Sequence, residues 1–208
     1  MGTPPDFATA WAALPPAARR CLELAHRAWL DDGLPVGAVL TDETGTIVTE
    51  GRNRAYDPPG GPDHLQGTPL AHAELNALAA ARTAWNLGTH TLWSSHRPCA
   101  MCTAAAGFTG VGTVRYLAED PWAEATGHRP TTDLPLLGPT EDHWASVVAA
   151  ALFLADTIRR AGPTHPVIQK AHPETATLAN TFAQLRTPDL QMLITETWHT
   201  IPKAATPP

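Results

Sequence analysis

Basic residues are few and scattered in this chain of 208 residues. Lysine and arginine together number 14 against 20 acidic residues, so the formal net charge is −6 with histidine neutral. No cluster of four or more basic residues occurs along the chain. A protein that grips a nucleic-acid backbone usually carries a basic stripe. We therefore expect no long nucleic-acid partner.

The sequence also lacks a long apolar run. No segment approaches the roughly 18 apolar residues that a membrane-spanning helix needs. The N-terminal stretch MGTPPDFATAWAALPP has neither the basic start nor the small-residue cleavage site of a signal peptide. Hydrophobic residues make up 43% of the chain, as in globular proteins. We expect a soluble, cytoplasmic protein with no membrane partner.

Cysteine is rare, and its odd count argues against a disulfide framework. The three cysteines are Cys21, Cys99 and Cys102. In a chain with these cytoplasmic features, thiols serve either packing or chemistry. Cys21 lies beside the apolar face of a predicted helix, and we interpret it as a packing residue.

Up to residue 118, the spacing of apolar and turn-forming residues alternates between helix and strand. In chain order it predicts a helix over 15–33, a hairpin over 36–53, a helix over 70–85, a strand over 89–95, a helix over 98–110 and a strand over 111–118. This order indicates an α/β fold, in which helices cover the faces of a sheet.

Beyond residue 118 the pattern changes. Residues 119–140 are proline-rich and irregular, and helical spacing returns over 141–160, 174–186 and 188–199. We expect a loose arm or a short helical turn over 1–14. The sequence thus predicts a core over 1–118 and a mostly helical extension over 119–208 that packs on it.

Two short stretches carry the chemistry. PLAHAELNAL places His72 and Glu74 at a predicted helix start, and RPCAMC places Cys99 and Cys102 on one face of the next helix. Thiolates are favoured at a helix N-terminus. Two thiolates and one imidazole make three zinc ligands and leave a fourth position for water, as in catalytic zinc sites. A nearby carboxylate that does not bind the metal can move protons, a role that fits Glu74.

The motif H-x-E followed by P-C-x-x-C resembles the signature of the zinc-dependent cytidine/nucleobase deaminase superfamily. The resemblance covers about residues 17–118 and includes VGAVLTDETGTIVTEGRNRA, which is similar to the hairpin of guanine deaminases and bacterial tRNA adenosine deaminases. It implies a three-layer α/β/α sandwich with a mixed five-stranded sheet, and a homodimer.

The same resemblance implies roles for particular residues. His72, Cys99 and Cys102 would hold Zn2+, and Glu74 would protonate the ring nitrogen and the departing ammonia. Asn53 occupies the place of an asparagine that binds the base in these relatives. Backbone N–H groups near Ala73 and Cys99 would steady the tetrahedral intermediate.

The chain departs from the motif just before the cysteines. Many relatives have glutamate before P-C, whereas this sequence reads SSHRPC, with Arg97 at that place and His96 before it. A histidine near that place also occurs in some deoxycytidylate deaminases. Arg97 could meet an anionic group of the substrate or pair with an acidic side chain. Trp122 and Trp198 are candidates for an aromatic pocket wall from the later part of the chain.

These features predict a zinc-dependent hydrolytic deaminase of a small purine or pyrimidine base, nucleoside or nucleotide. A guanine-type aminopurine is slightly favoured because of the hairpin and Asn53. A deoxycytidylate or other cytosine compound is the nearest alternative, and a tRNA adenosine is third because the C-terminal stretch PDLQMLITETWHTIPKAATPP carries a single lysine. A catalytically idle interaction module with the same fold is the non-enzyme alternative, against which the intact Glu74 argues.

Overall fold

The computed structural model describes residues 6–60, 65–126, 132–139 and 142–201. The elements up to residue 118 are α1 (Phe7–Ala13), α2 (Pro16–Leu30), β1 (Gly37–Thr41), β2 (Ile47–Arg52), α3 (Ala73–Ala79), the 3-10 turn η1 (Leu87–Thr89), β3 (Thr91–His96), α4 (Ala100–Phe108) and β4 (Thr113–Ala118). After them come α5 (Pro121–Thr126), β5 (Leu136–Leu137), α6 (His143–Ala161), α7 (Pro166–Lys170), α8 (Pro173–Leu185), α9 (Leu190–Thr197) and the 3-10 turn η2 (Trp198–Thr200).

The strands form a mixed five-stranded sheet, which confirms the predicted fold class. Their spatial order is β2-β1-β3-β4-β5. β1 pairs antiparallel with β2 and β3, while β4 pairs parallel with β3 and β5. The fifth strand, which sequence analysis did not locate, comes from the segment after residue 118. It lies parallel beside β4 at the edge of the sheet.

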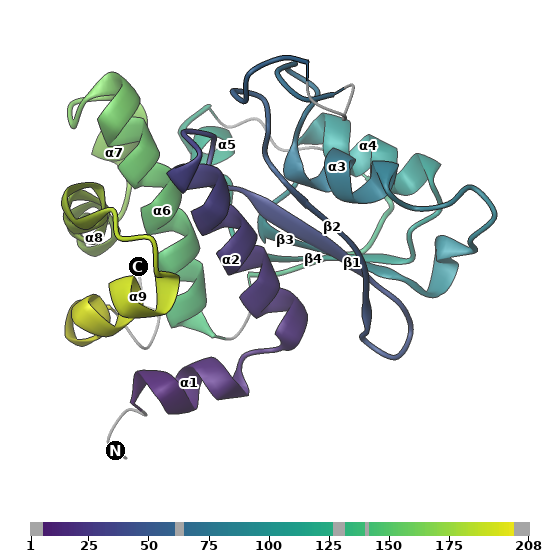
Figure 1. Cartoon of the computed structure of the whole chain (residues 1–208), viewed down its shortest axis with the longest axis horizontal. Coiled ribbons are helices and arrows are strands. Elements are labelled where there is room, and N and C mark those ends of the chain that lie inside the picture. The colour runs from purple at the N-terminus through teal and green to yellow at the C-terminus, as the bar shows by residue number, and fades with distance from the viewer. Residues whose placement is uncertain (1–5, 61–64, 127–131, 140–141, 202–208) are drawn as a thin grey trace.

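Helices cover both faces of the sheet and make a three-layer sandwich (Figure 1). On one face, Leu40 of β1 and Leu92 of β3 share an apolar cluster with residues of α3 and α4. On the other, Val39 of β1 packs with α2 and α6. Every residue of β1 is buried because this inner strand has helices over both of its faces.

Two glycines let helices approach the sheet closely on opposite faces. A Cβ added at Gly37 of β1 would lie 2.7 Å from the backbone nitrogen of Ala25 in α2, and one at Gly51 of β2 would lie 2.6 Å from the nitrogen of Ala77 in α3. No larger side chain fits at either distance. Gly51 therefore sets how closely α3, which carries Glu74, lies on the sheet.

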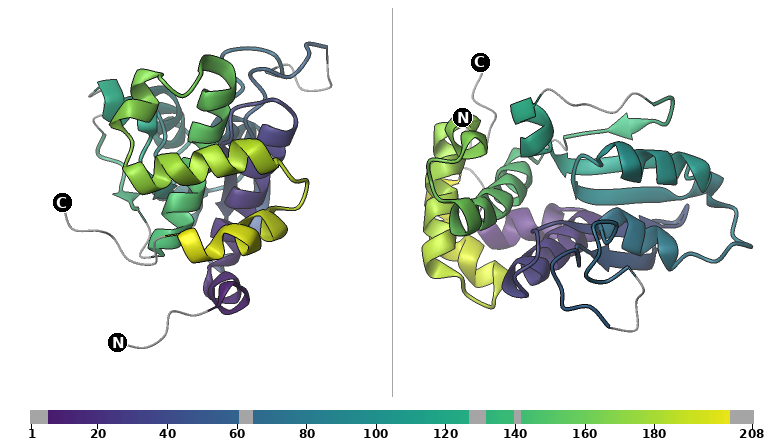
Figure 2. Two further views of the ribbon diagram at one scale, coloured as in Figure 1. Left: turned by 90° about the vertical axis from the view of Figure 1, so that its left-hand side faces the viewer. Right: turned by 90° about the horizontal axis from the view of Figure 1, so that it is seen from above.

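The C-terminal helices build a further layer outside α2 and α6. Helix α6 is buried on nearly all sides, because it packs against the sheet and α2 on one side and against α8 on the other. Figure 2 shows α8 and α9 on the outer side of α6, away from the sheet. Helix α6 thus contacts both the sheet and α2 and completes the second helical layer.

Several element boundaries differ from the prediction. Helix α3 covers Ala73–Ala79 rather than 70–85, because His72 is its extended N-cap and Asn86 caps a separate 3-10 turn. The N-terminal arm contains a real helix, α1, which Asp6 caps by accepting from the N–H of Thr9 at 2.8 Å. Helices α5 and α7 were not predicted, whereas α6, α8 and α9 fall close to their predicted ranges.

Within the described ranges, no helix is long and apolar enough to cross a bilayer.

Candidate metal centre

His72 and Glu74 lie at the N-terminal end of α3. His72 is the N-cap residue with extended backbone angles, φ −70° and ψ 152°, so its side chain leaves the helix end instead of joining a helical face. Pro69 precedes this helix start. A tight turn follows it, in which the N–H of His72 donates to the carbonyl of Leu70 at 2.7 Å. Glu74 follows in the first helical turn and is buried, with 3% of its surface exposed.

Cys99 and Cys102 occupy the matching position on α4. Cys99 is the N-cap residue, directly after Pro98, and Cys102 lies in the first turn. Both thiols therefore sit where free backbone N–H groups and the helix dipole favour negative charge. The parallel strand β3 and the short connection after it bring this helix start beside the start of α3.

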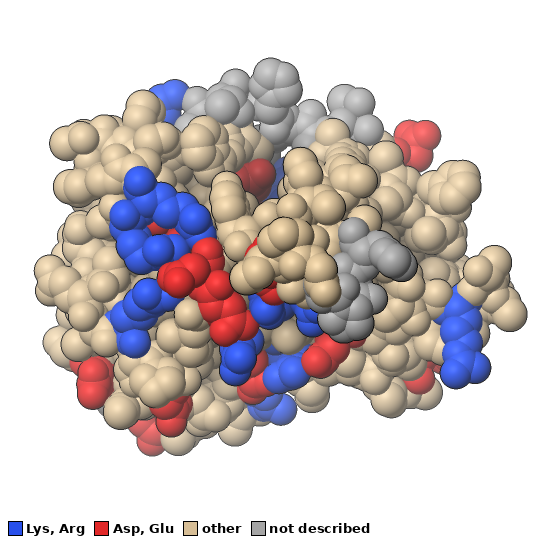
Figure 3. All heavy atoms as spheres, turned by 45° about the horizontal axis from the view of Figure 1, so that its top comes forward, with Lys and Arg blue, Asp and Glu red and all other residues tan. Residues whose placement is uncertain are grey.

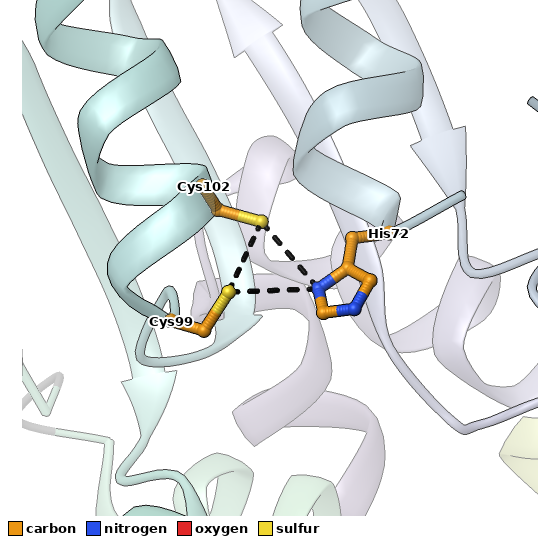
Figure 4. A group of neighbouring side chains, drawn as sticks. All are labelled: His72, Cys99 and Cys102. Atoms are coloured by element: carbon orange, nitrogen blue, oxygen red, sulfur yellow. Dashed lines mark hydrogen bonds between the residues drawn. The ribbon is translucent and has the colours of Figure 1, made fainter. Parts of the chain in front are cut away.

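Three donor atoms from these two helix starts converge on one point (Figure 4). The Sγ of Cys99 lies 3.7 Å from Nδ1 of His72, and the Sγ of Cys102 lies 3.5 Å from the same nitrogen. The two sulfurs are 3.6 Å apart. A tetrahedral zinc ion with Zn–S bonds of about 2.3 Å and a Zn–N bond of about 2.0 Å needs donors about 3.5–3.8 Å apart. The donor set and its spacing therefore fit zinc.

The electrostatics of the cluster favour a negative charge on sulfur. The hydrogen bond between the two thiols, assisted by His72, lowers the pKa of Cys99 to about 4. The same bond, together with burial, raises the pKa of Cys102. The hydrogen bond to Cys99 raises the pKa of His72. Cys99 thus supplies a thiolate before a metal binds, and metal binding would release the proton of the Cys102 thiol.

Glu74 lies beside the donor set as an unligated acid. Its Oε2 is 3.5 Å from the Sγ of Cys102, and its Oε1 accepts from the hydroxyl of Ser94 on β3 at 3.0 Å. Burial raises the pKa of Glu74 above its ordinary value. A carboxyl group with a raised pKa beside the donor set is suited to both taking up and releasing a proton.

These groups open onto a cavity of about 230 Å³. Its walls come from the loop before β1, the ends of β2 and β3, the starts of α3 and α4, the segment after β4, and α6: Leu34, Val36, Asn53, His72, Glu74, His96, Arg97, Cys99, Asp120, Trp122 and Phe153. A cavity of this kind, with an apolar wall and a few polar groups, is the usual form of a small-molecule site.

Most of the predicted site residues gather at this cavity. Asn53 and Arg97 line it, and Arg97 also pairs with Glu119 at 3.4 Å. Trp122 lines it and is 45% exposed. Ala73 is buried as the first residue of α3, between the two motif residues, but its side chain is not part of the wall.

Trp198 lies elsewhere, so the interpretation of it as a pocket wall is wrong. Its ring packs against those of Phe7 and Trp144, with centroids 5.5 Å and 5.4 Å apart. The physical reason is that α9 and η2 lie outside α6, so that α6 separates them from the metal cavity. The aromatic residues that the extension supplies to the cavity are Trp122 and, from α6 itself, Phe153.

Sequence reasoning missed three kinds of lining residue. Asp120 directly follows a parallel strand, and ligand sites of α/β sheets gather at such strand ends, so that rule could have indicated it. Leu34 and Val36 lie at the start of the predicted hairpin. Both are apolar, so nothing in their chemistry indicated a binding site. Phe153 is one of many apolar residues in α6, and no local pattern separates a pocket wall from the core.

Fold and site together define a three-layer α/β/α protein with an open His-Cys-Cys zinc centre. Residues 16–118 match the family model of the cytidine and deoxycytidylate deaminase zinc-binding region. Through this region the chain belongs to the zinc-dependent cytidine/nucleobase deaminase superfamily.

Curated relatives resemble part of the chain. The tRNA-specific adenosine deaminase of Haemophilus influenzae is 35% identical over 114 residues, which cover 53% of this chain and 61% of that protein. The tRNA(Ile)-lysidine synthase of Deinococcus radiodurans is 37% identical over 128 residues, which cover 59% of this chain and 19% of that protein. The chain thus spans less than two thirds of the length of either relative.

A solved structure shares the fold. The guanine deaminase from Nitrosomonas europaea superposes with a TM-score of 0.52 at 23% identity, over 73% of this chain and 94% of that one. At this identity the likeness confirms the cytidine deaminase-like architecture.

Proposed function

We propose that this protein is a zinc-dependent hydrolytic deaminase that exchanges the exocyclic amine of a small purine or pyrimidine compound for oxygen and releases ammonia. One observation carries the proposal: His72 and Cys99 of the zinc donor set, the unligated acid Glu74 and Asn53 line one cavity of about 230 Å³, and Cys102 completes the donor set beside them. A closed structural zinc site would instead use a fourth protein ligand and would not border a cavity.

His72, Cys99 and Cys102 would hold the metal. Zinc bound there supplies Lewis acidity, which lowers the pKa of a water molecule toward neutrality and so provides a nucleophile. The carboxylate of Glu74 takes up the proton that this water loses. It delivers that proton to the ring nitrogen next to the reacting carbon. It then takes the second proton from the hydroxyl group now bonded to that carbon and passes it to the departing amine, so that water and the aminoheterocycle become ammonia and the oxo product.

Other residues hold the substrate. Asn53 is 2% exposed, and the NH2 group of its amide can donate to an acceptor on a heterocycle edge. Phe153 and Val36 add apolar surface for the ring. Trp122 is half-exposed at the cavity, and its ring is of a kind that stacks on flat heterocycles. The backbone N–H groups near Ala73 and Cys99 would steady the tetrahedral intermediate.

We favour a guanine-type aminopurine slightly, because the hairpin and Asn53 are similar to those of guanine deaminases. A cytosine compound such as deoxycytidylate is the nearest alternative. A tRNA adenosine is the other candidate, and the tRNA-specific adenosine deaminase of Haemophilus influenzae, at 35% identity, favours it. Arg97 has its charge opposed by Glu119 at 3.4 Å, which weakens its attraction for a substrate phosphate and supports an uncharged base.

The test is ammonia release by the zinc-loaded chain. Guanine, 2,6-diaminopurine, cytosine, cytidine, deoxycytidylate, adenosine and a tRNA anticodon stem-loop form the panel, and a Glu74→Gln variant serves as the inactive control. Release from one member that the control abolishes supports the proposal and names the substrate class. If zinc-loaded protein releases no ammonia and binds none of the panel in calorimetry, the enzyme proposal falls and the interaction-module alternative takes its place. A homodimer remains our expectation, which sedimentation will test.

A further inference from the structure

The loop 53–57 follows β2 and begins with the cavity residue Asn53. The side-chain oxygen of Asn53 accepts from the N–H of Ala55 at 3.0 Å, and its backbone N–H donates to the carbonyl of Val36 at 2.9 Å. The oxygen is thus committed to the loop's own backbone. The orientation of the Asn53 amide therefore depends on the conformation of this loop.

Arg52 closes the base of the loop. Its Nη1 and Nη2 donate to the two carboxylate oxygens of Asp57 at 2.9 Å and 2.7 Å, and Nη1 also reaches the backbone carbonyl of Asn53 at 3.0 Å. The side chains of Arg52 and Asp57 are only 15% and 7% exposed. A bidentate pair of this kind is geometrically strict. It joins the last residue of β2 to the last residue of the loop.

Arg160, which belongs to the C-terminal extension, contacts the loop at Tyr56. Its guanidinium lies 4.2 Å from the centroid of the Tyr56 ring, in a cation–π contact. The same guanidinium donates to Oδ2 of Asp156 at 2.7 Å and to the backbone carbonyl of Asp32. Because Asp156 is completely buried in α6, it fixes the guanidinium rigidly beneath the ring. Figure 3 shows basic and acidic side chains interleaved on one face of the molecule.

We propose that Arg160 is a positioning residue for heterocycle binding: together with Arg52 it clamps the loop 53–57 and so holds Asn53 in the metal cavity. The inference rests on the proposed function for the role of Asn53. Neither arginine is among the described residues that line the cavity, so both act through the loop. The extension thereby contributes to substrate binding at a distance, in addition to supplying Phe153.

Arg159 provides a matched control. It donates to the other oxygen of Asp156 at 2.7 Å and pairs with Asp32 at 3.3 Å. Of these two neighbouring arginines, only Arg160 lies over Tyr56 in the described part of the chain. Arg159→Ala therefore removes an equal charge from the Asp156 carboxylate but leaves the contact with Tyr56 in place. A difference between the two variants points to what Arg160 alone contacts, which is the Tyr56 ring and the backbone carbonyl of Asp32.

The first experiment is amide hydrogen exchange on the zinc-loaded full chain. The reporters are the N–H groups of Ala55 and Asp57, which donate to Oδ1 of Asn53 and to the carbonyl of Arg54. Arg160→Ala should speed their exchange about 2- to 5-fold, the range expected for loss of an exposed cation–π contact, and Arg159→Ala should leave it unchanged. Equal exchange in both variants overturns the clamp, whatever the substrate is.

The second experiment is kinetic and uses the best substrate of the ammonia panel. Arg160→Ala should raise KM about 2- to 5-fold while kcat and zinc content stay constant. In an Asn53→Ala background the same substitution should have no further effect, because the residue that it positions is gone. Additive effects of the two substitutions would show a purely structural role.

Variants at Tyr56 keep the test decisive if Arg160→Ala does not fold. Tyr56→Leu removes the ring but leaves the pairs of Asp156 intact, and it should reproduce the faster exchange. Tyr56→Phe keeps the ring and should match the wild type. A panel without any turnover would contradict the proposed function, while the exchange measurements would still decide whether the clamp exists.

Discussion

The thiol of Cys102 and the carboxyl group of Glu74 face each other across the starts of α4 and α3, with Sγ 3.5 Å from Oε2. Glu74 nevertheless stands apart from the donor group that His72, Cys99 and Cys102 form among the described residues. A carboxyl group one contact away from a ligand can exchange protons with a molecule at the metal without occupying a coordination position. This relationship separates metal binding from proton transfer, and the two can be tested independently.

Glu74→Gln should abolish turnover and preserve the metal. The amide keeps the size of the carboxyl group and can still accept from Ser94, whose hydroxyl lies 3.0 Å from Oε1 in the native chain. Loss of a general acid–base group should lower kcat about 10²- to 10⁴-fold. Ammonia release and elemental analysis on the same sample check both halves. A variant that retains most of its turnover would assign proton transfer to another group.

Removal of a sulfur ligand should have the opposite pattern. Cys102→Ser should lower the zinc content of purified protein from about one ion per chain to a small fraction, because three protein ligands are the minimum for tight binding at such sites. Cys21→Ala is the matched control, since Cys21 is a buried thiol in α2 outside the donor group. Elemental analysis after dialysis is the measurement. Equal zinc in both variants would contradict the assigned ligand set.

The zinc centre was predictable because all of its members come from two short motifs. His72 and Glu74 are two residues apart, and Cys99 and Cys102 are three apart, so local helix geometry determines how each pair points. The α/β sandwich followed from the alternation of helix and strand before residue 118. From α2 to β4, the folded chain has the predicted order of helices and strands, with the short 3-10 turn η1 added between α3 and β3.

The cavity wall was less predictable because it depends on long-range packing. Phe153 reaches the cavity only because α6 crosses the sheet face beside α2, a contact that no local spacing encodes. The short strand Leu136–Leu137 lies in a proline-rich segment, and its assignment depends on pairing with β4. Trp198 was interpreted as a pocket wall because it is an aromatic residue late in the chain. In the folded chain α6 separates it from the cavity.

Asp156→Ala should destabilise the fold strongly. The carboxylate is completely buried and receives 2.7 Å hydrogen bonds from Arg159 and Arg160, whose side chains are 32% and 29% exposed. Removing it leaves two neighbouring guanidinium groups without their buried partner. Because both remain partly hydrated, we expect a loss of about 2–4 kcal/mol in the free energy of unfolding, below the full cost of an isolated buried charge.

Urea denaturation measures this loss against a surface control. Glu50→Ala removes the partner of Arg20, and these two side chains are 44% and 38% exposed. Exposed ion pairs contribute about 1 kcal/mol or less. Similar losses in the two variants would indicate that the charges at the C-terminal end of α6 are well solvated, which would also weaken the case for a rigid Arg160.

His96 should make the fold sensitive to acid. The side chain is 3% exposed, and burial lowers its pKa from the ordinary 6.5 to about 4, against a weaker opposing effect of the Ala149 carbonyl. Between pH 6.5 and about 4 the unfolded chain therefore binds the proton that the folded chain refuses. The contribution of His96 to stability is complete above that window and is lost as the pH falls through it, by roughly 3 kcal/mol in total.

His96→Phe removes this titration and keeps a ring against Phe153, which packs on the imidazole at a centroid distance of 5.3 Å. The free energies of unfolding of both chains should be measured by urea denaturation at pH 7 and pH 4.5, with a chelator present so that zinc loss does not contribute. Between these pH values the wild type should lose about 2–3 kcal/mol more than the variant. Equal losses of unfolding free energy in the two chains would mean that the imidazole of His96 is protonated within the folded chain. Water or a carboxylate would then have to reach its Nε2, and the apolar contact with α6 would have to open on acidification.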